Sequence, residues 1–503
     1  MPHRLSKSRY TDGVKCHKLL WWKVHEPLAI ELQPDKVLQD RFDQGKQVGE
    51  IARTHFPGGV LVPAPHQDVA RSVTRTRQLI DERAPAIFEA SFLADDTFVA
   101  VDILTPSDGG FHLTEVKQTS SQKEEHLPDV AVQIHVLQRS GLRITGADVM
   151  HLNKDCHFPD LSNLFERTDV TQAVQPLLKK VGWEIDAQLA MIDGPLPDVS
   201  VGLQCHEPHA CPFMARCWPD DPDHIMRLFN VGPKRGCDFL GTGVTRISDL
   251  PPSQKLSPTQ KRQIRAMREH RIIVEPGLAA ALEPFNCKLG FLDFETINRA
   301  VPVWPGMAPH EQAPAQFSYH EANGDGTYQH AEYLAEGPKD CRPELARCMI
   351  DATKDAEKVA TYSGFEKTRI RGLQKAVPEL RPELEELESK LIDLLPVVRE
   401  NVYHPDFGGS FSLKYVLSPL VPDLTYSDLV IVDGLVASVE IARLLFVAGK
   451  IPRAEHDRVR QDLLNYCERD TWAMVRVLEK LRELATGALA VPPGRAPHPH
   501  PQP

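Results

Sequence analysis

At 503 residues the chain is too long for one hydrophobic core, which stops growing near ~250 to 300 residues, so two domains and a connector are expected. Hydrophobic residues make up 42% and charged residues 25% of the chain, as in globular proteins, and no apolar run approaches the ~20 residues of a membrane span. The formal net charge of -11 argues against a protein that coats nucleic acid by bulk electrostatics, but it is compatible with metal sites, which concentrate carboxylates.

The first residues, MPHRLSKSRY, lack the apolar core and the small-residue cleavage site of a secretory signal, which predicts a cytoplasmic protein. The ten cysteines are therefore expected to be reduced, and metal-binding or core roles are favoured over disulfides. Residues 1–222 mix short helical and strand patterns and end in a cysteine-rich turn, so we expect them to form the first domain.

The segment TFVAVDILTPSDGGFHLTEVKQTSS predicts two strands around the turn SDGG. Apolar side chains alternate on one face of the first strand, which places Asp102 on the other face. On the second strand Glu115 and Lys117 leave the same face, because they are two residues apart. Two carboxylates can hold Mg²⁺ or Mn²⁺ at a phosphodiester, while a lysine orients the attacking water or offsets developing charge. Alone, the pattern is also typical of a solvated strand face.

Gln133, on the following helical segment DVAVQIHVLQ, is placed to position a nucleotide or the lysine. Together, Asp102, Glu115, Lys117 and Gln133 resemble the PD-(D/E)xK nucleases, and in particular the RecB-like branch that includes CRISPR-associated exonucleases.

The resemblance extends to the N-terminal segment LSKSRYTDGVKCHKLLWW, where Cys16 matches the first cluster ligand of that branch. Glu89, in IFEASF, matches a further acidic position upstream. One departure is the segment GEIARTHFPGG, in which Arg53 stands near the place of an early histidine of the branch, with His55 as a substitute.

Cys205, Cys211 and Cys217 lie within thirteen residues, which favours a metal site. Their six-residue spacing is unlike a Cys-x-x-Cys zinc knuckle and leaves a fourth ligand to come from elsewhere, with Cys16 as the natural candidate. The RecB-like resemblance implies a 4Fe-4S cluster held by these four cysteines. Zinc completed by neighbouring histidines and inert core cysteines are the alternatives. The histidines are His206 and His209, and five isolated cysteines are predicted to be small buried hydrophobes: Cys156, Cys237, Cys287, Cys341 and Cys348.

Residues 223–284 carry a basic, helical pattern, with FNVGPKRGCDFLGTGVTRISDL followed by LSPTQKRQIRAMREHR. The glycines between short helices resemble a helix-hairpin-helix unit, whose turns present backbone N–H groups to phosphate. The alternative is a solvated pair of linker helices.

Residues 285–485 follow a pattern of strands and then helices, which predicts an α/β domain closing with a helix from about 458 to 484. In GFLDFETIN, Asp293 and Glu295 share one face of an apolar strand. In NYCERDTWAMVRVLEKL, Tyr466 and Asp470 lie on the same side of one helix, and Asp470 falls on the apolar face. A buried aspartate costs several kcal/mol unless a positive group meets it, so a metal shared with Asp293 and Glu295 is predicted. The alternative pairs Asp470 with an arginine.

These residues resemble the DnaQ-like, ribonuclease H-fold exonucleases of the four-acid type, with a Tyr-x-x-x-Asp third motif. The segment TYSGFEKTRI resembles the middle motif and places Glu366 where most members have aspartate, and Asp393 in LIDLLP is the reserve candidate. The resemblance implies two metals about 4 Å apart at the scissile phosphate, with Tyr466 orienting the water.

The segment YHPDFGGSFSLKYVLSPL offers Lys414, Ser410, Phe411 and Tyr415 for phosphate contact and base stacking, or else forms a packed loop. The second half as a whole resembles an uncharacterised domain family that follows RecB-like nuclease domains.

The sequence therefore predicts an α/β protein: a PD-(D/E)xK restriction-endonuclease-like domain (1–222), a helical connector (223–284), a ribonuclease H-like, DnaQ-like domain (285–485) and a disordered, proline-rich tail (486–503). We expect a metal-dependent nuclease, a DNA exonuclease of repair or of defence against foreign DNA, with nucleic acid as its partner, DNA rather than RNA, and no membrane. The alternatives are an RNA 3′-end exonuclease and a nucleic-acid-binding scaffold with decayed sites.

Overall fold

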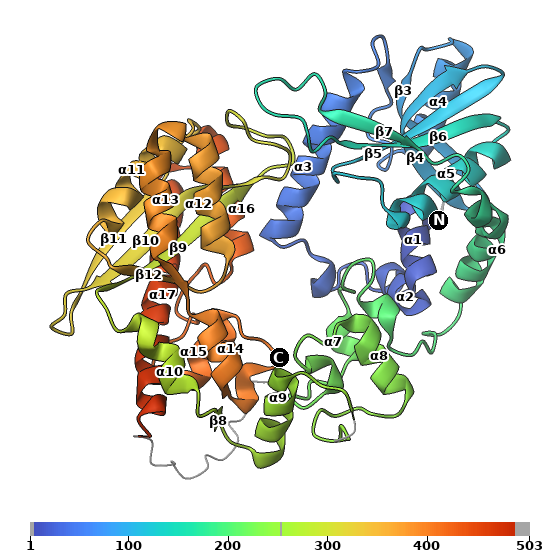
Figure 1. The fold of residues 1–503 in the computed structure, drawn as a ribbon. Helices are drawn as coiled ribbons and strands as arrows, with labels where there is room; N and C mark the ends of the chain where they lie inside the picture. Colours follow the sequence, from blue (N-terminus) through green and yellow to red (C-terminus); the bar gives the residue numbers. More distant parts are fainter. Residues whose placement is uncertain (1–4, 252–253, 488–503) are drawn as a thin grey trace. The chain divides into compact units, whose positions relative to one another are not determined.

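The computed structural model of the chain describes residues 5–251 and 254–487 (Figure 1). With 48% helix and 18% strand in mixed sheets, the protein belongs to the α/β class. Its contacts define two compact units, one of Met1–Asp220 with Ile297–Ala313 and one of Asp221–Thr296 with Pro314–Pro503. Within the described ranges, no helix is both long and apolar enough to span a bilayer. The predicted disordered tail lies outside the described residues, except for Thr486 and Gly487.

The first unit is built on a seven-stranded sheet in the order β2-β3-β4-β5-β6-β7, with β1 beside β4. Strands β3, β4 and β5 are antiparallel, β5 and β6 are parallel, and β7 returns antiparallel to β6. The predicted hairpin is confirmed as β4 and β5. The strands are β1 (Leu5–Ser6), β2 (Val60–Leu61), β3 (Ile87–Ala94), β4 (Thr97–Ser107), β5 (Gly110–Lys117), β6 (Ile144–Leu152) and β7 (Phe165–Asp169).

Helix α5 is nearly surrounded by the core of this unit, because its sequence LPDVAVQIHVLQR is apolar on most sides and its proline fits the first turn. It packs on strands β3, β4 and β6 and contacts helices α1 and α6. The helices of the unit are α1 (Lys7–Lys15), α2 (His17–His25), α3 (Lys36–Arg53), α4 (Val69–Asp81), α5 (Leu127–Arg139), α6 (Gln175–Ile192) and α7 (Met214–Cys217).

A segment from the second half of the chain, Ile297–Ala313, belongs to the first unit. Its Ala300 and Val301 pack in a small core with Val48 of α3 and Leu152 of β6. Arg299 of the same segment forms an ion pair of 2.7 Å with Asp40. The predicted second domain, 285–485, includes these residues, so its boundary differs from that of the second unit at this segment.

The second unit contains a five-stranded sheet in the order β11-β10-β9-β12-β13. Strands β9, β12 and β13 are parallel, and β10 and β11 form an antiparallel hairpin. Gly290 of β9 is required for close packing, since a Cβ there would lie 2.1 Å from the hydroxyl of Tyr319. The strands are β9 (Leu289–Asn298), β10 (Gln312–Ala322), β11 (Tyr328–Leu334), β12 (Lys358–Thr361) and β13 (Leu391–Asp393).

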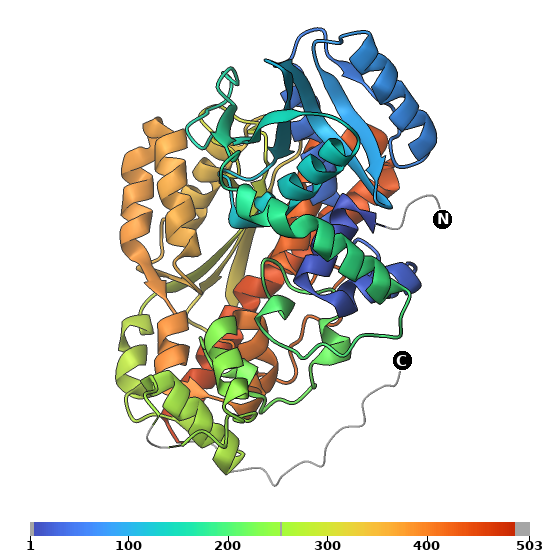
Figure 2. The ribbon, with the colours of Figure 1, turned by 90° about the vertical axis from the view of Figure 1, so that its right-hand side faces the viewer.

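This sheet lies between two groups of helices (Figure 2). Helices α11 (Arg342–Thr353), α12 (Phe365–Ala376) and α13 (Arg381–Lys390) cover one face, where Leu292 and Phe294 of β9 pack in a common core with them. The long helix α17 (Arg453–Ala485), which confirms the predicted closing helix, lies on the other face with α16 (Gly434–Phe446). Odd-numbered residues of β9 therefore face α17.

Residues 223–284, the predicted connector, lie in the second unit and have a small core of their own around Ile225, Phe239 and Ile264. Buried Arg262 donates to the backbone carbonyl of Arg399 at 2.7 Å. The segment is thus packed rather than solvated, and its helix-hairpin-helix resemblance stays a prediction.

The remaining elements are α8 (Pro233–Gly241), α9 (Pro258–Glu269), β8 (Ile273–Val274), α10 (Leu278–Leu282), α14 (Leu395–Asn401), β14 (Val402–Tyr403), α15 (Leu413–Leu420) and 3-10 turns at Ile30–Leu32, Glu124–His126, Leu203–Cys205, Ile225–Arg227, Glu283–Phe285, Pro378–Leu380, Pro405–Phe407 and Ala448–Lys450.

Candidate metal and active sites

Three carboxylates of the second unit converge between β9 and α17. Asp293 and Glu295 leave β9 on the face turned to α17, because Leu292 and Phe294 occupy the opposite core. Asp470 reaches them from α17. One oxygen from each of the three lies within 4.8 Å of the others, and both Glu295 and Asp470 are buried. The structure thus brings together residues that are widely separated in the chain.

This cluster is electrostatically unfavourable without a cation. Burial and then the charge of Asp470 raise the pKa of Asp293 and of Glu295 well above the ordinary values. Burial also raises the pKa of Asp470 to about 6, against the opposing effects of Tyr426 and Lys414. A divalent cation, which prefers carboxylate oxygens, would remove the repulsion. The three carboxylates could therefore hold a metal ion.

Asp470 is not neutralised by an arginine in an ion pair, within the described part of the chain. Its neighbour Arg469 pairs with Asp428 at 2.8 Å instead. Asp470 accepts a hydrogen bond from the hydroxyl of Tyr426, a loop residue that no sequence pattern marked. The arginine alternative is therefore not what the structure contains.

Tyr466 lies one turn before Asp470, and the charges of Asp470 and Glu295 contribute, after burial, to a raised pKa of its phenol. Lys414 lies above this ring, with its Nζ 5.1 Å from the ring centroid, and donates to the carbonyl of Val432 at 2.6 Å. Its charge lowers the pKa values of Glu295 and Asp470. Lys414 therefore adds a positive charge beside the three carboxylates.

Glu366 approaches the cluster from α12. It is buried, accepts a hydrogen bond of 3.4 Å from Ser363, and its charge raises the pKa of Asp293. Burial, and less so the charge of Asp393, raises its own pKa to about 7. Asp393 accepts the backbone N–H of Leu395 at 2.9 Å and lies beside Glu366. Both candidates for the fourth acid are thus near, although Glu366 stands outside the three-oxygen cluster.

Only part of the predicted contact strip faces solvent. Phe411 is buried and packs edge-on against Phe229 and Tyr403. For this residue the packed-loop alternative holds, and it is not available for base stacking. Tyr415 is exposed, and Ser410 lies on the surface with its hydroxyl near Ser412.

The predicted residues of the first unit also come together. The amide of Gln133 on α5 donates to Glu115 at 2.8 Å, and the Lys117 Nζ lies 2.9 Å from the other oxygen of Glu115. Asp102, on β4, accepts the backbone N–H of Val116 at 2.7 Å. Burial and the nearby charge of Glu115 raise the pKa of Asp102 to about 7. The carboxylates of Asp102 and Glu115 and the ammonium of Lys117 therefore lie close together in one buried site.

A residue that the sequence interpretation missed completes this site. Lys7, at the start of α1, donates to Glu115 at 2.8 Å across 108 positions of chain. Burial alone would raise the pKa of Glu115, but Lys117 and Lys7 outweigh it and hold that pKa below its usual range. No local pattern signals such a contact.

We predict that Lys7→Met lowers the free energy of unfolding by about 1 to 2 kcal/mol, less than a fully buried ion pair because the Lys7 side chain is 23% exposed and Lys117 remains. The lowered pKa of Glu115 stabilises the fold above about pH 4. The decrease in unfolding free energy caused by Lys7→Met is therefore complete at neutral pH and becomes smaller as the pH falls below about 4. Urea unfolding at pH 7 and pH 3.5 measures it. Lys46→Met, at an exposed position of α3, is the control, and an unchanged unfolding energy for Lys7→Met contradicts the prediction.

Glu89 adds a third carboxylate near Asp102, since its charge raises the pKa of Asp102. It has a φ of +56° in the middle of β3, a strained conformation for a side chain larger than glycine. Arg53 holds it with an ion pair of 2.8 Å. Arg53, rather than His55, thus reaches this site; the His55 ring packs against Phe165.

The four predicted cluster cysteines line one pocket: Cys16, Cys205, Cys211 and Cys217. All are half-buried and none forms a disulfide. Burial raises the pKa of the Cys211 and Cys217 thiols, so thiolates there need a positive partner. The pocket is otherwise largely apolar, with Leu19, Trp22 and Phe213 in its wall, which suits an iron–sulfur cluster.

The zinc alternative fits less well. His206 packs edge-on against Trp218, His209 is exposed near Glu125, and neither lines the cysteine pocket. Among the isolated cysteines, Cys156 and Cys341 are buried as expected, Cys237 and Cys287 are half-buried, and Cys348 is exposed. The expectation for Cys348 was wrong, because it lies on the solvent side of α11.

One family model, described as Domain of unknown function (DUF2779), matches residues 290–412. The match includes Asp293, Glu295 and Glu366 and ends before Tyr466 and Asp470. No curated protein and no solved structure matches the chain. The comparisons therefore relate a quarter of the chain to a family without supplying a reaction.

Proposed function

We propose that this protein is a metal-dependent nuclease that acts as a DNA exonuclease, with one acidic site in each unit. The observation that carries the proposal is the convergence of Asp293, Glu295 and Asp470, all largely removed from water, within 4.8 Å. Uncompensated, such a cluster destabilises the fold, so its presence favours a role in binding divalent cations.

For the second unit we propose a DnaQ-like, ribonuclease H-like fold, supported by acids on a central strand and on a helix packed against it. Mg²⁺ or Mn²⁺ bound there would polarise the phosphodiester and lower the pKa of a bound water. Tyr466 would orient the attacking water, and Lys414 would hold the phosphate. Glu366, with Asp393 beside it, would supply the fourth acid.

For the first unit we propose a RecB-like PD-(D/E)xK fold. It is supported by two carboxylates and a lysine, Asp102, Glu115 and Lys117, on neighbouring strands, and by Gln133, which fixes one oxygen of Glu115. The pKa of the doubly paired Glu115 is lowered, so this carboxylate stays ionised at neutral pH, as a metal ligand must be. We further propose that the cysteine pocket holds a 4Fe-4S cluster, whose fit rests on four thiols around one largely apolar space.

The assay uses 5′- and 3′-labelled single-stranded DNA and RNA with Mn²⁺ or chelator, on the wild type and on Asp293→Ala and Lys117→Ala. We expect Mn²⁺-dependent shortening of DNA. Asp293→Ala should lose the activity of the second unit and retain that of the first, and Lys117→Ala should do the reverse. Asp351→Ala, at an exposed position of α11, is the control. Absence of metal-dependent cleavage, or cleavage unaffected in both variants, contradicts the proposal, and cleavage of RNA alone redirects it to RNA.

A further inference from the structure

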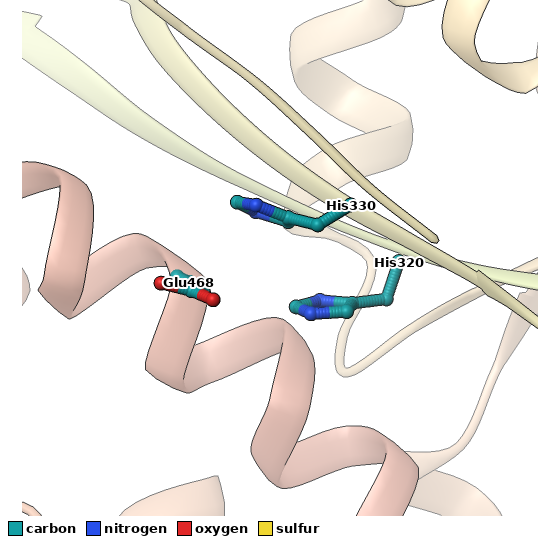
Figure 3. Close-up of side chains that lie close together, drawn as sticks. All are labelled: His320, His330 and Glu468. Carbon is teal, nitrogen blue, oxygen red and sulfur yellow. The ribbon is translucent and has the colours of Figure 1, made fainter. Parts of the chain in front are cut away.

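Two histidines and a glutamate meet on the face of the second sheet that carries α17 (Figure 3). His320 of β10 and His330 of β11 are direct partners across the antiparallel hairpin, and their rings stack with centroids 4.5 Å apart. Glu468 faces them from α17. One ligand atom from each of the three lies within 4.8 Å of the others.

Hydroxyl groups behind the rings determine which nitrogen of each histidine is free. Thr471 Oγ1 donates its only proton to the carbonyl of Glu468, at 3.0 Å. It must therefore accept in its two other contacts, at 2.8 Å each, from His320 Nδ1 and from the Ser318 hydroxyl. The Nδ1 of His320 is thus protonated, and its Nε2 carries the lone pair.

The protonated nitrogen of His330 follows from the same hydroxyl groups. Ser318 spends its proton on Thr471, so in its 2.9 Å contact with His330 Nε2 it can only accept. Nε2 of His330 is therefore the protonated nitrogen, and Nδ1 carries the lone pair. Orientation of a ligating histidine through a hydrogen bond from its second nitrogen is typical of metal sites.

We propose that His320, His330 and Glu468 form a site for a divalent cation of the zinc type. Two imidazole nitrogens and one carboxylate match the donors of zinc sites with three protein ligands and one open position. The all-oxygen cluster of Asp293, Glu295 and Asp470 instead suits Mg²⁺ or Mn²⁺. The proposal does not rest on the nuclease activity. Because Glu468 lies on α17 between Tyr466 and Asp470, the cation would tie the β10–β11 hairpin to the helix turn that carries them.

The test is the zinc content of the full-length protein after dialysis against Zn²⁺ with Mg²⁺ in excess. We expect His330→Ala and Glu468→Gln each to bind one Zn²⁺ fewer per chain than the wild type, because each lacks one ligand of the site. Any zinc held by the cysteine pocket is the same in all forms and does not affect this difference. His157→Ala, at an exposed histidine of the first unit, should bind as the wild type does. His330 and Glu468 are exposed, so both variants should fold.

Two further measurements separate ligation from general disturbance. Ser318→Ala, which removes the acceptor behind His330, should weaken Zn²⁺ binding about 10- to 100-fold while keeping the stoichiometry. Zn²⁺ should raise the melting temperature of the wild type more than that of His330→Ala. Equal zinc content and equal melting shifts in wild type, His330→Ala and Glu468→Gln would overturn the proposal, whatever the result of the nuclease assay.

Discussion

Asp293→Asn is expected to abolish Mn²⁺-dependent cleavage at the site of the second unit, about a thousandfold or more, and at the same time to stabilise the metal-free protein. The loss in rate follows because a metal contributes several kcal/mol of transition-state stabilisation and Asn removes a charged ligand. The gain in stability follows because the change removes a buried charge that Asp470 and Glu366 repel. We expect a gain on the order of 1 to 4 kcal/mol, the range found when buried ion pairs are replaced by apolar residues.

The stability effect should depend on pH with a definite sign. The pKa values of Asp293 and Glu295 are raised in the folded state above their unfolded values near 4, and that of Asp470 is raised to about 6. The folded state then binds more protons than the unfolded state, so stability falls as pH rises from about 4 through these raised values. Asp293→Asn should flatten this decline, and Mn²⁺ should offset it in the wild type only.

Melting temperatures with chelator at pH 5 and pH 8, and again with Mn²⁺, measure both effects on one preparation. Asp351→Asn provides the matched control, since that carboxylate is 77% exposed and belongs to no cluster of ligands. If Asp293→Asn melts below the wild type at pH 8 without metal, the three carboxylates do not repel as the structure indicates. If it keeps Mn²⁺-dependent cleavage in the presence of Lys117→Ala, the second site is not catalytic.

The elements that carry the acids were predictable because their signals are local. Alternation along GFLDFETIN places Asp293 and Glu295 opposite Leu292 and Phe294, and the i, i+4 spacing on α17 puts Tyr466 beside Asp470. Asp470 lies on an apolar helix face, where burial of its charge is costly, and this predicted a metal shared with Asp293 and Glu295. A buried carboxylate needs a cation or a hydrogen-bond donor as a partner, so its position in the sequence indicates that such a partner is nearby.

The remainder depends on contacts that leave no local pattern. Lys7 reaches Glu115, and Tyr426 reaches Asp470 from a loop, but neither position differs in sequence from an ordinary surface residue. His320 and His330 become neighbours only through the register of the β10–β11 hairpin, and that register cannot be determined from the sequence pattern. The segment around Phe411 is compatible with a contact surface or with a packed loop, and only the tertiary contacts show that this ring fills a core.

Cys205→Ser is expected to remove the brown colour of an iron–sulfur protein and to destabilise the first unit. Cys16 and Cys205 are half-buried ends of a loop of almost two hundred residues that the cluster would close. In the chain-entropy model a cross-link over a loop of that length restricts the unfolded chain by about 5 kcal/mol, before any strain is subtracted. The variant should therefore unfold at lower denaturant concentration than the wild type.

Cys348→Ser is the matched control, because that thiol is exposed and far in sequence from the pocket, and it should keep both colour and stability. Iron and sulfide content, visible absorbance and urea unfolding of anaerobically purified protein report the outcome. A colourless wild type that carries one zinc lost in Cys205→Ser would assign the pocket to zinc. Iron retained in full by Cys205→Ser, with an unchanged visible spectrum, would show that this thiol is no ligand, since the apolar wall of Leu19, Trp22 and Phe213 offers no replacement and a serine oxygen in its place would alter the absorbance.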